Sequence, residues 1–129
     1  MSAPVTHFEI YGETPEKLAQ FYASLFEWQI EKAPGVDYWR IQTEPKSGTG
    51  FDAGLTYRPA GGPNCWLHYV TVDSVDAALD RAERMGAHIV RPKTAVPRTG
   101  WYAVLADPQG NSFAIWQTDP TAFPPPEPD

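Results

Sequence analysis

Polar and hydrophobic residues alternate in the run VTHFEIYG at residues 5–12. A period of two is typical of a β-strand, and it places Phe8 and Ile10 on one side of that strand. His7 and Glu9 share the other side. The strand is therefore predicted to have one apolar and one polar face.

The next run, PEKLAQFYASLFE at residues 15–27, has its apolar residues at helical spacing. Thr14 is predicted to cap this helix, and Pro15 suits its first position. Three strand-like runs follow between turn-rich segments: WQIEK (28–32), DYWRIQTE (37–44) and FDAGLTYR (51–58). The first half of the chain therefore predicts the order β-α-β-β-β.

The second half repeats this order after roughly 60 residues. Its helix, 74–86, is predicted to be capped by Ser74 and ended by Gly86. The strand-like runs around it are WLHYVTVD (66–73), AHIVRP (87–92), GWYAVLAD (100–107) and NSFAIWQT (111–118). In the alignment of the halves, YWRI (38–41) falls on WYAV (101–104), and GFDAGL (50–55) falls on GNSFAI (110–115).

The repeat predicts an α+β fold of two tandem βαβββ modules, at residues 4–57 and 66–118, with a Gly- and Pro-containing connector at 58–65. Each helix covers one face of its strands. Pairing of the modules would enclose the other faces as a curved mixed sheet, a cup with the helices outside. We expect one domain over residues 1–119 and a loose, proline-rich tail at 120–129.

The composition of the chain limits the classes of partner that it is expected to bind. The formal charge is −6 and the ten Lys and Arg residues are scattered, which argues against a nucleic-acid partner. No apolar run reaches the roughly 20 residues that span a bilayer. A single cysteine, Cys65, and an N-terminus without signal-peptide character predict a cytoplasmic protein.

Several motifs resemble the vicinal oxygen chelate superfamily, which includes glyoxalase I, bleomycin-resistance proteins, fosfomycin-resistance enzymes and extradiol dioxygenases. They are HFEI at the start, FYASLFEW after the first helix and, above all, ADPQGNSFAIWQ near the end. The resemblance covers about residues 4–118. One departure is Glu27, where members often have glycine, so the turn that ends the helix must accommodate a side chain.

The resemblance implies four metal-ligand positions, on the first and last strand of each module. Here they hold His7, Gly54, Leu67 and Ala114, so three of the four lack a donor atom. A catalytic divalent ion generally needs about three protein ligands. The expectation is that no cofactor is bound; the alternative is a divalent metal in a rearranged site made by His7, Glu9 and Asp52.

His68 lies next to the ligand position at Leu67. A shift of one residue turns a strand side chain to the opposite face. We therefore expect His68 to be half-buried and to point toward the helix at residues 74–85, away from the cup.

The cup wall predicted by alternation combines aromatic and polar side chains, as small-molecule sites do. It consists of His7, Glu9, Tyr11, Tyr38, Arg40, Asp52, Thr56, Tyr69, Thr71, Trp101, Ser112 and Trp116. His7 and Glu9 are the candidate catalytic residues; the candidate ligand-binding residues are Tyr38, Arg40, Asp52, Tyr69, Trp101 and Trp116. Two alternatives remain: the aromatic rings fill the space between the modules, and Arg40 is a solvated edge residue instead of an anion clamp.

Three functions follow from these observations. The leading one is a metal-independent protein that binds a small organic molecule, as in resistance or sequestration. The alternatives are a lyase, isomerase or dioxygenase that uses His7 and Glu9, and a non-catalytic interaction module. Unpaired sheet edges and the resemblance both predict a homodimer.

Overall fold

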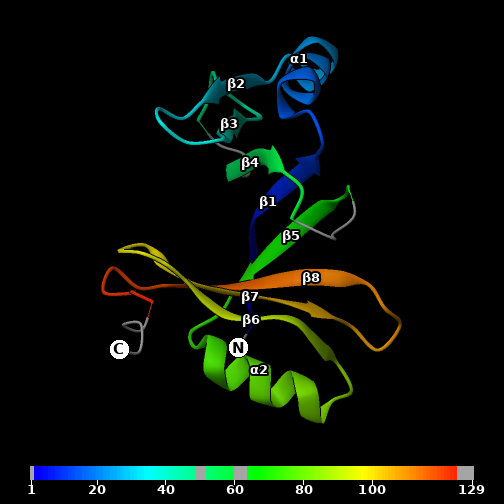
Figure 1. The fold of residues 1–129 in the computed structure, drawn as a ribbon, viewed down its shortest axis with the longest axis vertical. Coiled ribbons are helices and arrows are strands. Elements are labelled where there is room, and N and C mark those ends of the chain that lie inside the picture. Colours follow the sequence, from blue (N-terminus) through cyan, green and yellow to red (C-terminus); the bar gives the residue numbers. More distant parts are fainter. Residues whose placement is uncertain (1, 49–51, 60–63, 125–129) are drawn as a thin grey trace, which may run out of the picture. The chain divides into compact units, whose positions relative to one another are not determined.

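The computed structural model describes residues 2–48, 52–59 and 64–124, and it confirms the α+β fold with two βαβββ series. For Asp52 it describes the backbone only. The elements, in chain order, are β1 (Val5–Gly12), α1 (Pro15–Phe26), β2 (Gln29–Lys32), β3 (Tyr38–Gln42), β4 (Asp52–Tyr57), β5 (Trp66–Thr71), α2 (Val75–Arg84), β6 (His88–Val96), β7 (Gly100–Ala106) and β8 (Ser112–Thr118) (Figure 1).

The chain forms two compact units whose boundary does not coincide with the connector. The N-terminal unit is Thr6–His68, and the C-terminal unit combines the described parts of Met1–Val5 and Tyr69–Asp129. The boundary therefore cuts β1 after Val5 and β5 after His68. The expected modules at 4–57 and 66–118 match the order of elements, but each unit includes the end of a strand that belongs to the other module.

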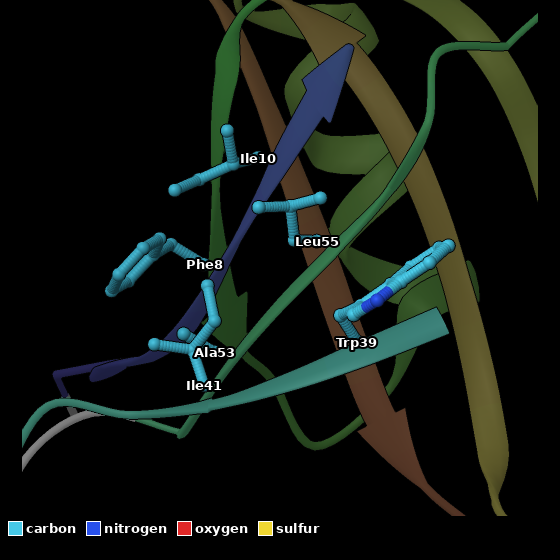
Figure 2. Close-up of a cluster of buried hydrophobic side chains, with 6 residues drawn as sticks. All are labelled: Phe8, Ile10, Trp39, Ile41, Ala53 and Leu55. Atoms are coloured by element: carbon cyan, nitrogen blue, oxygen red, sulfur yellow. The ribbon is translucent and has the colours of Figure 1, made fainter. Parts of the chain in front are cut away.

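In the N-terminal unit the strand order is β2-β3-β4-β1, with β4 and β1 parallel and the other pairs antiparallel. Alternate residues of β1, β3 and β4 form the core on the α1 side (Figure 2). The buried residues are Phe8, Ile10, Trp39, Ile41, Ala53 and Leu55, and Leu18, Ala19, Tyr22, Trp28 and Ile30 pack against them. The polar residues between them must project from the opposite face.

The C-terminal unit has the equivalent order β5-β8-β7-β6, with β5 and β8 parallel, and α2 lies along its strands (Figure 1). Its buried cluster consists of Val75, Leu79, Ala103, Leu105 and Ile115. Gln117 of β8 joins the helix to the sheet, because the backbone N–H of Val75 donates to its Oε1 atom at 2.9 Å. This bond satisfies an amide at the start of α2 that has no partner within the helix.

The helix ends follow the sequence signals in all but one case. Ser74 caps α2, since its Oγ atom accepts from the Ala77 N–H at 3.1 Å, and Gly86 has a φ of +99° after the helix. Thr14 stands at the N-cap of α1 but its side chain makes no capping hydrogen bond. Glu27 ends α1 in the left-handed conformation, with φ 58° and ψ 31°, so a side chain stands where the conformation favours glycine.

The expected loose tail at residues 120–129 is wrong for its first part. Ala122 is fully buried, and its carbonyl oxygen accepts from the Arg98 N–H at 2.8 Å. Asp119 accepts from the Thr121 hydroxyl at 2.6 Å. The chain is therefore held against the C-terminal unit as far as Phe123, and residues 125–129 lie outside the described part.

Among the described residues, neither helix is both long and apolar enough to cross a membrane.

Candidate functional site

The face of the N-terminal unit that points away from α1 brings most of the predicted site residues together. We call it the α1-distal face. The registers of β1, β4 and β3 form rows across it: Glu9, Gly54 and Arg40 in one, Tyr11, Thr56 and Tyr38 in the next, and His7, Asp52 and Gln42 in the third. The face predicted for His7, Glu9, Tyr38 and Arg40 is confirmed, and the Asp52 backbone lies opposite His7.

Tyr38 lies across Gly54 on this face. A methyl group built at Gly54 would overlap the phenol oxygen and ring of Tyr38. The absence of a side chain at Gly54 is therefore what makes room for the tyrosine. The resemblance assigns a metal-binding carboxylate to this position, and here an aromatic ring occupies the space.

Glu9 and His7 each have a neighbour on or beside the face. The Tyr11 hydroxyl donates to Glu9 Oε1 at 2.7 Å, which orients the carboxylate. His7 Nδ1 lies 3.4 Å from the Thr6 hydroxyl oxygen. Both His7 and Glu9 are half-buried, so each is within reach of a bound molecule.

The residues at the family's metal positions do not fit a metal. Leu67 and Ala114 are buried, at 4% and 0% exposure, and neither carries a donor atom. Gly54 is covered by Tyr38. Within the described residues, no three His, Cys, Asp or Glu side chains converge. His7 is thus the single donor among the four positions.

A cavity of about 200 Å³ opens at the β2–β3 end of the same face. In the β2–β3 register, Gln29 lies opposite Gln42, and Glu31 lies opposite Arg40, so all four side chains share the face of Arg40. The lining residues are Gln29, Glu31, Lys32, Ala33, Pro34, Arg40 and Gln42. Of these, Arg40 alone is predicted from the sequence. The alternation in QIEK and YWRIQ was the available signal for Gln29, Glu31 and Gln42.

The prediction that His68 is half-buried against the helix at residues 74–85 is wrong, because its side chain is exposed and its ring lies near a core residue of the N-terminal unit. Its ring centroid lies 6.2 Å from that of Phe8, which belongs to the core on the α1 side. Trp66, two residues earlier, stacks on the same Phe8 ring at 5.0 Å. His68 therefore lies away from the α1-distal face.

In the C-terminal unit, the sheet face predicted for Trp101 is wrong, because the alignment of the two halves is displaced there by one residue. Trp101 packs against the cluster beside α2, and its indole N–H donates to Asp119 Oδ2 at 2.9 Å. Tyr102 takes the opposite face, where its ring lies 6.4 Å from that of Tyr69. The true equivalent of Tyr38 is thus Tyr102, because both lie two residues before the partner of Gly54 or Ala114.

Tyr69 and Trp116 do lie on the face of the C-terminal unit that points away from α2. Tyr69 is opposite Ala114 and is buried, while Trp116 is opposite Tyr102 and is half-buried. The Trp116 ring occupies the space above Gly100, where a methyl group would meet it. Arg91 adds a positive charge, with its guanidinium carbon 5.9 Å from the Tyr102 ring centroid.

The DPQGN segment forms a tight turn between β7 and β8 that is organised by Asp107. The Asn111 and Gln109 N–H groups donate to Asp107 Oδ1 at 3.0 and 2.8 Å, and the Asn111 side chain donates to Oδ2 at 3.0 Å. These bonds, chiefly from Asn111, hold the pKa of Asp107 below its ordinary value of 3.8. The motif thus serves the turn.

Comparisons with known proteins identify the family and the fold. The family model of the glyoxalase-like domain matches residues 9–116. The Mycobacterium bovis protein named "Putative glyoxylase CFP32" is 30% identical over 116 residues, which is 87% of this chain and 43% of the relative. The chain therefore spans less than half the length of that relative.

Solved structures share the fold at low sequence identity. A glyoxalase/bleomycin resistance protein/dioxygenase superfamily member from Vibrio splendidus has a TM-score of 0.62 at 14% identity, covering 90% of this chain and 99% of its own. Methylmalonyl-CoA epimerase of Streptomyces coelicolor has a TM-score of 0.61 at 11% identity, covering 96% and 100%. With the family match over most of its length, this chain belongs to the glyoxalase-like domain family of the vicinal oxygen chelate superfamily.

Proposed function

We propose that this protein binds a small organic molecule without a metal ion, on the α1-distal face of its N-terminal unit. The observation that carries the proposal is Tyr38 lying across Gly54. It supplies an aromatic surface at the position where metal-dependent relatives need a ligand. Polar groups of His7, Glu9 and Arg40 on the same face can orient a ligand, as in other small-molecule sites.

The residue chemistry at the metal positions supports metal independence. A divalent ion at His7 would lack protein donors from Gly54, Leu67 and Ala114. Water would have to complete its coordination, and such an ion would be held weakly. The protein's contribution to binding is therefore expected to come from stacking on Tyr38 and from hydrogen bonds.

A thermal-shift screen of planar aromatic compounds, in the presence of a chelator, tests this proposal. A ligand present at 100 times its Kd should raise the free energy of unfolding by about 2.7 kcal/mol. The Tyr38→Ala variant should lose the shift. The control Val90→Ala, at an exposed position of β6 in the other unit, should retain it. A hit that binds Tyr38→Ala as tightly as the parent protein would contradict the proposal.

A second function, acid–base catalysis by His7 and Glu9, is favoured by one observation, the 2.7 Å hydrogen bond from Tyr11 to Glu9. A carboxylate fixed in this way on a ligand-binding face can serve as a general base in a lyase or isomerase. Proton NMR of each hit after incubation separates the two functions, because it detects both cleavage and an isomerisation that leaves the mass unchanged. Conversion by the parent protein that is lost in Glu9→Gln would establish the enzyme, whereas unchanged hits support binding alone.

A further inference from the structure

The cavity between β2 and β3 carries one opposed pair of charges. Arg40 and Glu31 are direct neighbours across the antiparallel strands, and both line the cavity. Opposed residues of this kind have Cβ atoms about 5 Å apart, close enough for an ion pair. Nevertheless, in the part of the chain that the structure describes, neither residue belongs to an ion pair.

The neighbouring side chains leave both charges available to the cavity. Gln29 Nε2 donates to Glu31 Oε1 at 2.9 Å, which holds the carboxylate on its own strand and leaves its second oxygen for another donor. Lys32 also lines the cavity, but its Nζ atom lies 3.7 Å from Asp37 Oδ1 and 5.6 Å from the Trp39 ring centroid, so its charge is already partnered. Besides this partnered ammonium, the cavity presents one guanidinium and one carboxylate that belong to no ion pair in the described residues.

The size of the cavity limits what it can hold. Its volume of about 200 Å³ is below the roughly 300 to 1,000 Å³ of sites that enclose a whole drug-sized ligand. It is sufficient for one polar end of a molecule. Arg40 and Tyr38 lie two residues apart on β3 and share a face, so the rest of such a molecule has a path toward Tyr38.

We propose that this cavity binds the zwitterionic end of a small molecule, a carboxylate and an ammonium on one carbon as in an amino acid. The carboxylate pairs with the Arg40 guanidinium, whose planar fork suits two parallel hydrogen bonds. The ammonium pairs with Glu31. A simple anion is disfavoured because Glu31 would repel it, and a simple cation is disfavoured by Arg40. The inference deepens the proposed function and rests on it, since the cavity opens on the same face.

Three probes of nearly the same shape test the inference: L-alanine, propionate, which lacks the ammonium, and ethylammonium, which lacks the carboxylate. Each is titrated into the full-length protein while NMR follows the Arg40 Nε–H and the side-chain amides of Gln29 and Gln42. L-Alanine is expected to give saturable shifts, with a Kd at least about tenfold lower than that of either other probe.

Charge-neutralising variants identify the residues responsible. Arg40→Gln and Glu31→Gln should each weaken L-alanine binding about tenfold or more, and Glu31→Gln should strengthen propionate binding. The matched controls Lys17→Gln and Glu16→Gln remove the same charges from the exposed side of α1 and should change neither affinity.

Three results would overturn the inference: shifts that never saturate, propionate binding as tightly as L-alanine, or L-alanine binding that survives Arg40→Gln. Any of these results would leave the proposed function standing if aromatic hits still bind to the parent protein and not to Tyr38→Ala. If no aromatic compound binds in a Tyr38-dependent manner but L-alanine still binds, only the proposed function is refuted.

Discussion

At the scale of single residues, the position to which the family resemblance assigns a metal ligand holds Gly54, and the Tyr38 ring fills the space in front of it. Gly54 is buried beneath the Tyr38 ring, and its register neighbours are Glu9 and Arg40. The α1-distal face thus has an aromatic ring between a carboxylate and a guanidinium. This arrangement suits stacking and hydrogen bonding to an organic ligand better than coordination of an ion.

Gly54→Ala should destabilise the N-terminal unit, because the new methyl group overlaps the Tyr38 phenol. The ring is half-buried and can shift, so we expect a loss of about 1 kcal/mol in the free energy of unfolding, the low end for overpacking. Urea unfolding measures the loss. In the Tyr38→Ala background the same substitution should cost markedly less; an equal cost in both backgrounds would show that the overlap is not its cause.

Asp107 predicts a specific pH dependence of stability. Its pKa is lowered in the folded protein by hydrogen bonds from Asn111 and Gln109, so folding favours the ionised form. The stabilisation is therefore present at neutral pH and is lost as the pH falls through the ordinary value of 3.8 toward the lower folded value. The difference in the free energy of unfolding between the parent protein and Asp107→Asn should therefore shrink as the pH falls through this range.

Direct NMR titration of the Asp107 carboxyl carbon checks the cause. A midpoint at or above 3.8 would contradict the hydrogen-bond account of the turn. Asp119 shifts in the same direction through Thr121 and Trp101, so its carboxyl should also titrate below its ordinary value.

At the scale of elements, periodicity predicted the order of strands and helices and the faces of the N-terminal unit. It succeeded there because Phe8 and Ile10 alternate with polar residues, which leaves one choice of face. It failed at GWYAVLAD, where Trp101 and Tyr102 are both aromatic and either can be the buried one. Ala103 and Leu105 decide the matter by burying the face of Trp101, a tertiary effect.

The polar cavity at β2 and β3 was missed for a different reason. Gln29 and Glu31 lie in a four-residue edge strand without a motif, and they become neighbours of Gln42 and Arg40 only through the β2–β3 register. Pairing register depends on turn geometry and packing, which a single sequence defines weakly for so short a strand.

Glu27 predicts a stabilising substitution at the end of α1. Its φ of 58° is unfavourable for a residue with a Cβ atom, and glycine relieves this strain. After the larger entropy of glycine in the unfolded chain is subtracted, Glu27→Gly should raise stability by about 0.5–1 kcal/mol. The control Met85→Gly, at the end of α2 with a φ of −95°, should lower it. Thermal unfolding of both variants gives the test, and destabilisation by Glu27→Gly would contradict the strain argument.

At the scale of the whole molecule, the sequence predicted two modules but not the division into units. The boundary inside β1 and β5 depends on long-range contacts, such as the 2.9 Å hydrogen bond from the Thr71 N–H to the Pro4 carbonyl oxygen. The packing of Ala122 is of the same kind, because composition alone marks a proline-rich segment as loose. Such contacts leave no local pattern in the chain.

We propose that the protein is a homodimer, and exposed apolar residues on α1 support this. Phe21, Leu25 and Phe26 are each at least half exposed, at 56%, 57% and 50%. Light scattering should give about twice the chain mass of 14.3 kDa at micromolar concentration. A chain shortened to Pro124 should give the dimer as well. A mass near that of one chain for the full-length protein would refute the dimer.

The most direct test of metal-independent binding is calorimetric titration of an aromatic hit into protein stripped by a chelator and, separately, into protein supplied with Zn²⁺, Ni²⁺, Mn²⁺ or Fe²⁺. The residues at the metal positions predict that the hit binds with the same Kd in every case, within about twofold. Elemental analysis of the purified protein should find less than one metal ion per chain. A Kd at least about tenfold lower with one of these ions, and restored to the stripped value by His7→Ala, would contradict the account.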